Sequence, residues 1–169
     1  EPAVRPGGQP DFSNVKIPAA GAVPRPDIDA APESMRDLAY SIIRVLNRHG
    51  EAVGPWAGTL SHQELLIGLR NMMRLRAFDA RMVMAQRQGK TSFYMQHLGE
   101  EAVSCAFRKA LSKGDMNFPT YRQAGLLIAD DYPLVTMMNQ IFSNENDPLH
   151  GRQMPVLHSA KDHGFFTVS

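Results

Sequence analysis

Residues 118–123, with the sequence FPTYRQ, place a tyrosine and an arginine together where a helix is expected to start. Arg122 carries a permanent charge that can pair with two phosphate oxygens at once, and the Tyr121 hydroxyl is a neutral donor. The first turn of a helix would add unpaired backbone N–H groups. These residue types suit a phosphate or diphosphate, although an arginine at a helix start is more often an ordinary surface residue.

A second candidate segment, TSFYMQHLGEE at residues 91–101, is rich in aromatic and apolar side chains just before another expected helix. Phe93, Tyr94 and Met95 are suited to line an apolar pocket. Local hydrophobic packing explains the same pattern without any ligand, so the two interpretations stay open on the residues alone.

The third segment, GRQMPVLH at residues 151–158, continues to a second histidine five positions further on. A zinc site needs three or four ligands with supporting groups, so His158 and His163 alone do not predict one. The remaining histidines are expected at the surface or in loops: His49, His62, His97 and His150. The chain contains no GxGxxG, GxxxxGK[ST] or GxSxG motif.

Helices are expected to hold these segments in place. Apolar spacing predicts a helix over residues 38–46, with Gly50 as its stop. Ser61 followed by Glu64 predicts a capping box and a helix running towards Gln88, with the apolar residues 65, 66, 69, 72 and 73 on one face. Another helix is expected from Glu100 to about residue 111, with apolar pairs at 102–103, 106–107 and 110–111.

The C-terminal third is expected to alternate short elements. Residues 116–119 are predicted to be extended, and residues 123–129 are predicted to form a helix. Asp131 is predicted to cap a further helix over about 134–142. Residues 144–164 are polar and predict a long loop. The sequence breaks off at Ser169 inside an apolar, strand-prone segment, so we expect the chain to be a fragment of a longer protein.

Composition narrows the function classes. Seven of the twelve prolines lie in residues 1–32, which predicts an extended arm that is either disordered or laid along a partner subunit. A net charge of +1 offers no electrostatic case for nucleic acid or an anionic membrane. The single cysteine, Cys105, reads as a small core residue, and it fits a reducing, cytoplasmic compartment.

Taken in order, the three segments resemble the α subunit of branched-chain 2-oxoacid dehydrogenases. The resemblance rests on FYM with GEEA at residues 93–102, YRQAG at 121–125 and GRQMP at 151–155, and it runs from about Ser34 to Ser169. The proline-rich arm is most similar to the bacterial members. The resemblance implies an α/β thiamine-diphosphate-binding fold with a parallel sheet between helices, of which residues 33–169 would be the N-terminal, mostly helical part.

The resemblance also implies a function and its residues. Such subunits join a β subunit in an α2β2 enzyme that decarboxylates branched-chain 2-oxoacids and passes the acyl group to the lipoyl group of an acyltransferase core. Tyr121 and Arg122 would hold the diphosphate, Phe93, Tyr94 and Met95 would line the substrate pocket, and Ser169 would lie at a monovalent-cation site, for instance for potassium. An apolar residue at position 95 favours a branched substrate over pyruvate.

The departures from the family pattern are equally informative. The magnesium motif, Gly-Asp-Gly with a later asparagine, is absent, since Gly114-Asp115 is followed by methionine. The magnesium ligands are therefore expected beyond this chain, and no catalytic acid or base is assigned within it. We expect the chain by itself not to decarboxylate 2-oxoacids. The alternatives are a noncatalytic helical interaction module and a pyruvate-specific relative.

Overall fold

The computed structural model describes residues 8–9 and 16–168, and the chain divides into two compact units, Glu1–Leu60 and Ser61–Ser169. Each unit is described by itself. The predicted cation residue Ser169 lies outside the described residues, as does most of the proline-rich arm before residue 16.

In the first unit, the helix predicted over residues 38–46 is wrong. The structure has a 3₁₀ helix, η1, at Pro32–Tyr40, and Ser41 is already extended. The following backbone pairs with other segments instead of with itself: the Arg44 carbonyl accepts from Gly21 N–H, and Leu46 forms an antiparallel bridge with Ala52. Gly50 therefore closes a turn rather than a helix, and the apolar residues 42, 43 and 46 stay exposed.

Within the described part of the arm, residues 16–31 form no helix or strand, as the prolines predict. The arm crosses a later loop where two glycines meet, because a Cβ on Gly54 would lie 2.2 Å from the Gly21 Cα. Trp56 donates from its indole to the Pro24 carbonyl, and the Arg25 guanidinium lies 5.6 Å from the centre of its ring. These contacts hold the arm against residues 44–56.

The second unit begins with the long helix α1, His62–Arg87. Its predicted capping box is confirmed: the Ser61 side chain accepts from Glu64 N–H, and the Glu64 carboxylate accepts from Ser61 N–H. The apolar face named from the sequence is not the face that packs. Leu65, Leu69 and Met73 are about half exposed or more, and the buried side chains are residues 71, 75, 78, 79, 82 and 85. The side of α1 that packs is therefore rotated away from its most apolar stripe.

Helix α2, Glu101–Ala110, lies where the sequence predicts it, but it too packs through an unexpected face. Glu101 and Ser104 are buried, whereas Val103 and Phe107 are 65% and 52% exposed. Short side chains at the contact let the neighbouring elements approach closely. Cys105 is partly buried with its sulfur 3.7 Å from the Gly68 carbonyl of α1, and burial raises the pKa of its thiol.

The helix predicted over residues 123–129 is split. A 3₁₀ turn, η2, occupies Tyr121–Gln123, and helix α3 follows at Gly125–Ala129. Helix α4, Leu134–Phe142, begins after Pro133, so the predicted Asp131 cap is wrong. Asp131 has a positive φ of 55°, and its carboxylate pairs with Arg74 of α1 at 2.6 Å.

The predicted loop at 144–164 contains short elements near its end. Strand β1, Ser159–Ala160, and strand β2, Phe165–Phe166, form an antiparallel pair around the 3₁₀ turn η3, Lys161–His163. On its other side β2 meets the predicted extended piece in a parallel bridge, Asn117 to Phe165, and Val168 N–H donates to the Pro119 carbonyl. Within the described residues the chain is mostly helical with this small sheet.

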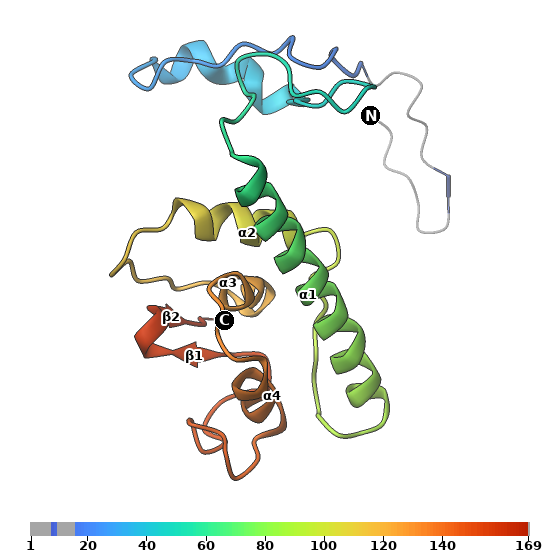
Figure 1. Cartoon of the computed structure of the whole chain (residues 1–169), viewed down its shortest axis with the longest axis vertical. Helices are drawn as coiled ribbons and strands as arrows, with labels where there is room; N and C mark the ends of the chain where they lie inside the picture. The colour runs from blue at the N-terminus through green and yellow to red at the C-terminus, as the bar shows by residue number, and fades with distance from the viewer. Residues whose placement is uncertain (1–7, 10–15, 169) are drawn as a thin grey trace. The chain divides into compact units, whose positions relative to one another are not determined.

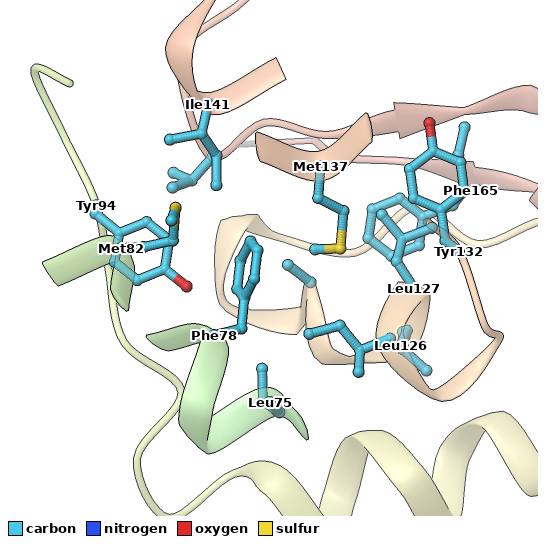
Figure 2. Packing of buried hydrophobic residues seen from close by; sticks show 14 residues of the cluster. Leu75, Phe78, Met82, Tyr94, Leu126, Leu127, Tyr132, Met137, Ile141 and Phe165 are labelled. Atoms are coloured by element: carbon cyan, nitrogen blue, oxygen red, sulfur yellow. The ribbon is translucent and has the colours of Figure 1, made fainter. Parts of the chain in front are cut away.

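The core of the second unit lies among α1, α3, α4 and the β1–β2 pair. Figure 1 shows these elements, and α1 contacts both α2 and α3. Figure 2 shows the side chains that meet there: Leu75, Phe78, Met82, Tyr94, Leu126, Leu127, Tyr132, Met137, Ile141 and Phe165. Among the described residues, no helix is both long and apolar enough to cross a membrane.

Candidate functional site

Tyr121 and Arg122 lie at the start of η2, between α2 and α3 in the chain. The Arg122 side chain is exposed, and its guanidinium carbon lies 5.3 Å from the centre of the Tyr121 ring. It forms no ion pair with any other described residue. This arrangement leaves the guanidinium available to an anion from outside the described part of the chain.

Two backbone amides of this turn are already used. Arg122 N–H donates to Thr120 Oγ1, and Gln123 N–H donates to the Thr120 carbonyl. The Gln123 side chain in turn accepts from Thr120 N–H at 2.9 Å. Two of the N–H groups expected to be free at this helix start are therefore occupied, so the side chains of Tyr121 and Arg122 would be the main ligands of a phosphate.

The structure brings the first and second candidate segments together. The rings of Phe93 and Tyr121 pack edge to face, with centroids 6.2 Å apart and planes at 78°. Both side chains are partly buried, and so is Met95. Phe93 therefore lies beside one of the predicted phosphate residues, and Met95 is also partly accessible, two residues further along the chain.

Tyr94 differs from its two neighbours because it points into the core. It is 6% exposed, and its ring packs edge to face on Phe78 of α1. Its hydroxyl donates to Asp79 Oδ1 at 2.7 Å. Burial, together with the charge of Asp79, raises the pKa of Tyr94 well above its usual value. Its hydroxyl is engaged within the protein, so Tyr94 supports the segment from behind.

The same carboxylate binds His97. Asp79 Oδ2 accepts from His97 N–H at 2.7 Å, and Asp79 Oδ1 lies 2.9 Å from His97 Nδ1. Burial alone would raise the pKa of Asp79, but the hydrogen bonds from His97 and Tyr94 outweigh it and lower the pKa below its usual value. Asp79 is therefore ionised at neutral pH, although its side chain is fully buried.

His97 was expected at the surface or in a loop, and the expectation of a surface position is wrong. It lies in the turn before α2, but it is only 2% exposed. Its Nε2 atom is buried with no hydrogen-bond partner in the described part of the chain. Within that part, Asp79 alone fixes the orientation of the imidazole.

The third candidate segment forms a separate buried network. His158 Nδ1 lies 3.1 Å from Gln140 Oε1, and Gln140 Nε2 donates to the Ser159 carbonyl. Burial, and after it the nearby His97, lowers the pKa of His158 to about 4. His163 instead pairs with Asp130 at 2.5 Å. The two histidines thus have different partners, and no set of three metal-ligating side chains gathers among the described residues.

A cavity of about 560 Å³ lies elsewhere, between the end of α2, α3 and the turn η3. Its charged lining includes Asp130, which pairs with both Arg108 and His163. The predicted site residues at 93–95 and 121–122 are not among its lining residues. The cavity therefore gives no support to the predicted site.

The sequence-based search missed Asp79 and Gln140, both fully buried polar residues. Asp79 had a detectable signal, because it occupies a helix position whose neighbours at 75, 78 and 82 are all apolar and buried. A carboxylate on such a face must find donors. Gln140 shows no comparable pattern, because its donors come from a loop almost twenty residues away.

Comparisons with known proteins agree on one family. The family described as "Dehydrogenase E1 component" matches residues 69–169, and that described as "2-oxoisovalerate dehydrogenase E1 alpha subunit N terminal" matches residues 1–33. A Pseudomonas aeruginosa protein named 2-oxoisovalerate dehydrogenase subunit alpha is 55% identical over all 169 residues, which cover 41% of its length.

More distant relatives carry related names. The mitochondrial 2-oxoisovalerate dehydrogenase subunit alpha of Mus musculus is 40% identical over 129 residues, 76% of this chain and 29% of that protein. An Arabidopsis thaliana relative, named subunit alpha 2, is 34% identical over 145 residues, 85% of this chain and 30% of that protein. The chain thus spans about two fifths or less of the length of these relatives, and it belongs to the dehydrogenase E1 component family.

Proposed function

We propose that this chain is the N-terminal part of the α subunit of a branched-chain 2-oxoacid dehydrogenase. The observation that carries the proposal is the Phe93–Tyr121 contact beside the exposed Arg122, because it joins an apolar wall to a phosphate-binding pair. The names of the relatives support the same substrate class. The full-length subunit would decarboxylate branched-chain 2-oxoacids and pass the acyl group to a lipoyl carrier.

The side chains present fit thiamine diphosphate. A diphosphate needs cationic and neutral donors, and the exposed Arg122 guanidinium and the partly buried Tyr121 supply one of each. When bound, thiamine diphosphate would supply the carbon nucleophile and electron sink that decarboxylation of a 2-oxoacid requires. Arg122 would neutralise part of the diphosphate charge, and Tyr121 would orient it.

The apolar residues would act on the substrate side chain. Phe93 and Met95 are partly buried and lie on one short turn, so they would exclude water and cover a branched aliphatic group. Each methylene removed from water contributes ~0.8 kcal/mol. Tyr94 would support this wall from the core side through its hydrogen bond to Asp79.

The complete fold would be the thiamine-diphosphate-binding α/β fold, with a parallel sheet between helices. The parallel bridge between Asn117 and Phe165 supports this proposal, since it is the kind of pairing from which such a sheet is built. The metal ligands would lie elsewhere in the full-length subunit, because the Gly-Asp-Gly motif is absent here. Magnesium bound by those ligands, and potassium at Ser169, would complete the cofactor site.

The partner of this subunit would be a β subunit in an α2β2 enzyme, docked to a lipoyl-bearing acyltransferase core in the bacterial cytoplasm. The proline-rich arm matches a family named for the N-terminus of such α subunits. This match supports a role of the arm in the assembly. The β subunit would provide the catalytic groups that this chain lacks.

The test is cofactor binding by the assembled enzyme, built from the full-length α subunit and its β subunit. Arg122→Ala should weaken thiamine diphosphate binding by ~1.5–3 kcal/mol, the scale of a lost hydrogen bond to a charged group. Arg81→Ala, which removes another exposed arginine on α1, is the matched control and should bind normally. Calorimetric titration gives both values, and an unchanged affinity for Arg122→Ala would remove this residue from the site.

A further inference from the structure

The turn formed by residues 93–97 is hydrogen-bonded to α1 through one buried side chain, Asp79, and Tyr94 also packs on Phe78 of the same helix. Its carboxylate accepts three hydrogen bonds, from the Tyr94 hydroxyl, the His97 backbone N–H and the His97 ring. All three donors belong to this one turn. No other described residue donates to Asp79, so every hydrogen bond that its carboxylate accepts holds this turn.

The attachment bears on the candidate site because of what lies next to Tyr94. Phe93 adjoins Tyr94 in the chain, and its ring meets Tyr121 edge to face. Tyr121 in turn lies beneath the Arg122 guanidinium. Three successive contacts therefore connect a buried carboxylate on α1 with the two residues assigned to the cofactor diphosphate.

A second anchor holds only the beginning of the segment. The Thr91 hydroxyl lies 3.1 Å from the Ile141 carbonyl of α4 and 3.4 Å from the Phe93 carbonyl. It fixes where the turn starts, but it makes no contact with residues 94–97. Loss of Asp79 would thus free the far end of the turn and leave the buried His97 ring with neither nitrogen paired.

We propose that Asp79 is a positioning residue of the cofactor and substrate site: it fixes the 93–97 turn so that Phe93 holds Tyr121 in place. The proposal rests on the proposed function, because it takes Tyr121 and Arg122 as the diphosphate residues. It extends the site to a residue that touches neither cofactor nor substrate. Asp79 acts through Phe93, and this route can be tested.

The central variant is Asp79→Asn in the assembled full-length enzyme. An amide has the size of the carboxylate, but its nitrogen donates and cannot accept, so at least one of the groups that now donate to Asp79 must accept a hydrogen bond instead or lose its partner. We expect the dissociation constant of thiamine diphosphate to rise about tenfold, measured by calorimetric titration well below the unfolding temperature.

Gln140→Leu is the matched control for general destabilisation. Gln140 is as deeply buried as Asp79 and also bonds several groups, but its partners are the loop at 153–159 and Tyr132. This variant should lower the unfolding temperature while leaving cofactor affinity within about twofold of the original. If it weakens cofactor binding as much as Asp79→Asn does, the positioning role is overturned.

A double-mutant cycle tests the route through Phe93. Phe93→Leu removes the ring that contacts Tyr121, so the Asp79→Asn change should then have almost no further effect on cofactor affinity. Full additivity of the two changes would overturn the proposal. If Asp79→Asn fails to assemble, Tyr94→Phe replaces it, since it keeps the ring and the charge of Asp79. We expect Tyr94→Phe to raise the dissociation constant about threefold by itself and to have no further effect once Phe93→Leu is present.

The two proposals fail in different ways. If Arg122→Ala and Tyr121→Phe leave thiamine diphosphate binding unchanged, the proposed site is wrong whatever Asp79 does. If those two variants weaken binding while Asp79→Asn and Tyr94→Phe do not, the site stands and the positioning role of Asp79 is wrong.

Discussion

A methyl group on Gly125 would lie 2.7 Å from Ser104 Oγ, because α3 starts directly against the buried face of α2. The same methyl group would come within 2.7 Å of Leu75 on α1. Both contacts are closer than packed atoms tolerate, so Gly125→Ala should lower the free energy of unfolding by about 1–3 kcal/mol. Thermal or urea unfolding of the full-length subunit measures this loss.

Gly68→Ala is the natural control, because it makes the same change in a helix where space is available. A Cβ at Gly68 meets nothing within 4 Å. Alanine favours a helix over glycine by about 1 kcal/mol, so this variant should be neutral or stabilising. If both variants lost the same free energy of unfolding, the close contacts at Gly125 would not be the cause of the loss.

The positions of α1, α2 and α4 could be predicted from the sequence, but the faces of α1 and α2 that pack could not. The stripe at Leu65, Leu69 and Met73 is the more apolar, yet α1 packs through residues that include Asn71 and Asp79. Periodicity reports where apolar residues recur, not which of two amphipathic faces meets a neighbour. The packed face of α1 combines the apolar residues at 75, 78 and 82 with Asp79, and the sequence does not show which distant residues donate to that carboxylate.

The capping box of α1 gives a second stability prediction. Ser61 accepts from Glu64 N–H and so satisfies one of the donors that a helix start leaves unpaired. Ser61→Ala should therefore cost about 1 kcal/mol in the free energy of unfolding. Thr59→Ala serves as the comparison, since Thr59 is exposed and caps no helix; if both variants lose the same stability, the cap is not the cause.

For the candidate site, the residue types and their order along the chain could be recognised in the sequence. Which of these residues are neighbours in three dimensions could not. Nothing in the sequence shows that Phe93 meets Tyr121, because the two residues lie 28 positions apart and are joined by the path of α2. Two of the amides expected to be free near Arg122 are occupied because Thr120 and Gln123 form a small capping box of their own. That box was visible in the sequence as a threonine three residues before a glutamine.

His158 predicts how stability depends on pH. Burial lowers its pKa to about 4 from 6.5, so the folded protein resists protonation that the unfolded chain accepts readily. Stability should therefore be complete above pH 6.5 and fall as the pH drops towards 4, where the loss reaches about 3 kcal/mol. Urea unfolding across this range measures the slope.

The variant His158→Gln identifies the source of that slope. Glutamine can still donate to Gln140 Oε1, but it does not titrate. Most of the loss in the free energy of unfolding between pH 6.5 and 4 should therefore disappear in this variant. An unchanged slope would mean that other groups govern the acid sensitivity.

Met95 predicts the substrate preference of the assembled enzyme, on the basis of the proposed function. Met95 is partly buried on the same turn as Phe93, so an apolar side chain there favours a branched substrate over pyruvate. Met95→Asn should lower kcat/KM for 2-oxoisovalerate relative to pyruvate by roughly tenfold, because the two extra carbons of the branched group are worth ~0.8 kcal/mol each. Competition between the two substrates measures the ratio directly. Met84→Asn changes an exposed methionine of α1 and should leave the ratio unaltered; if the ratio moves equally in both variants, Met95 does not line the substrate pocket.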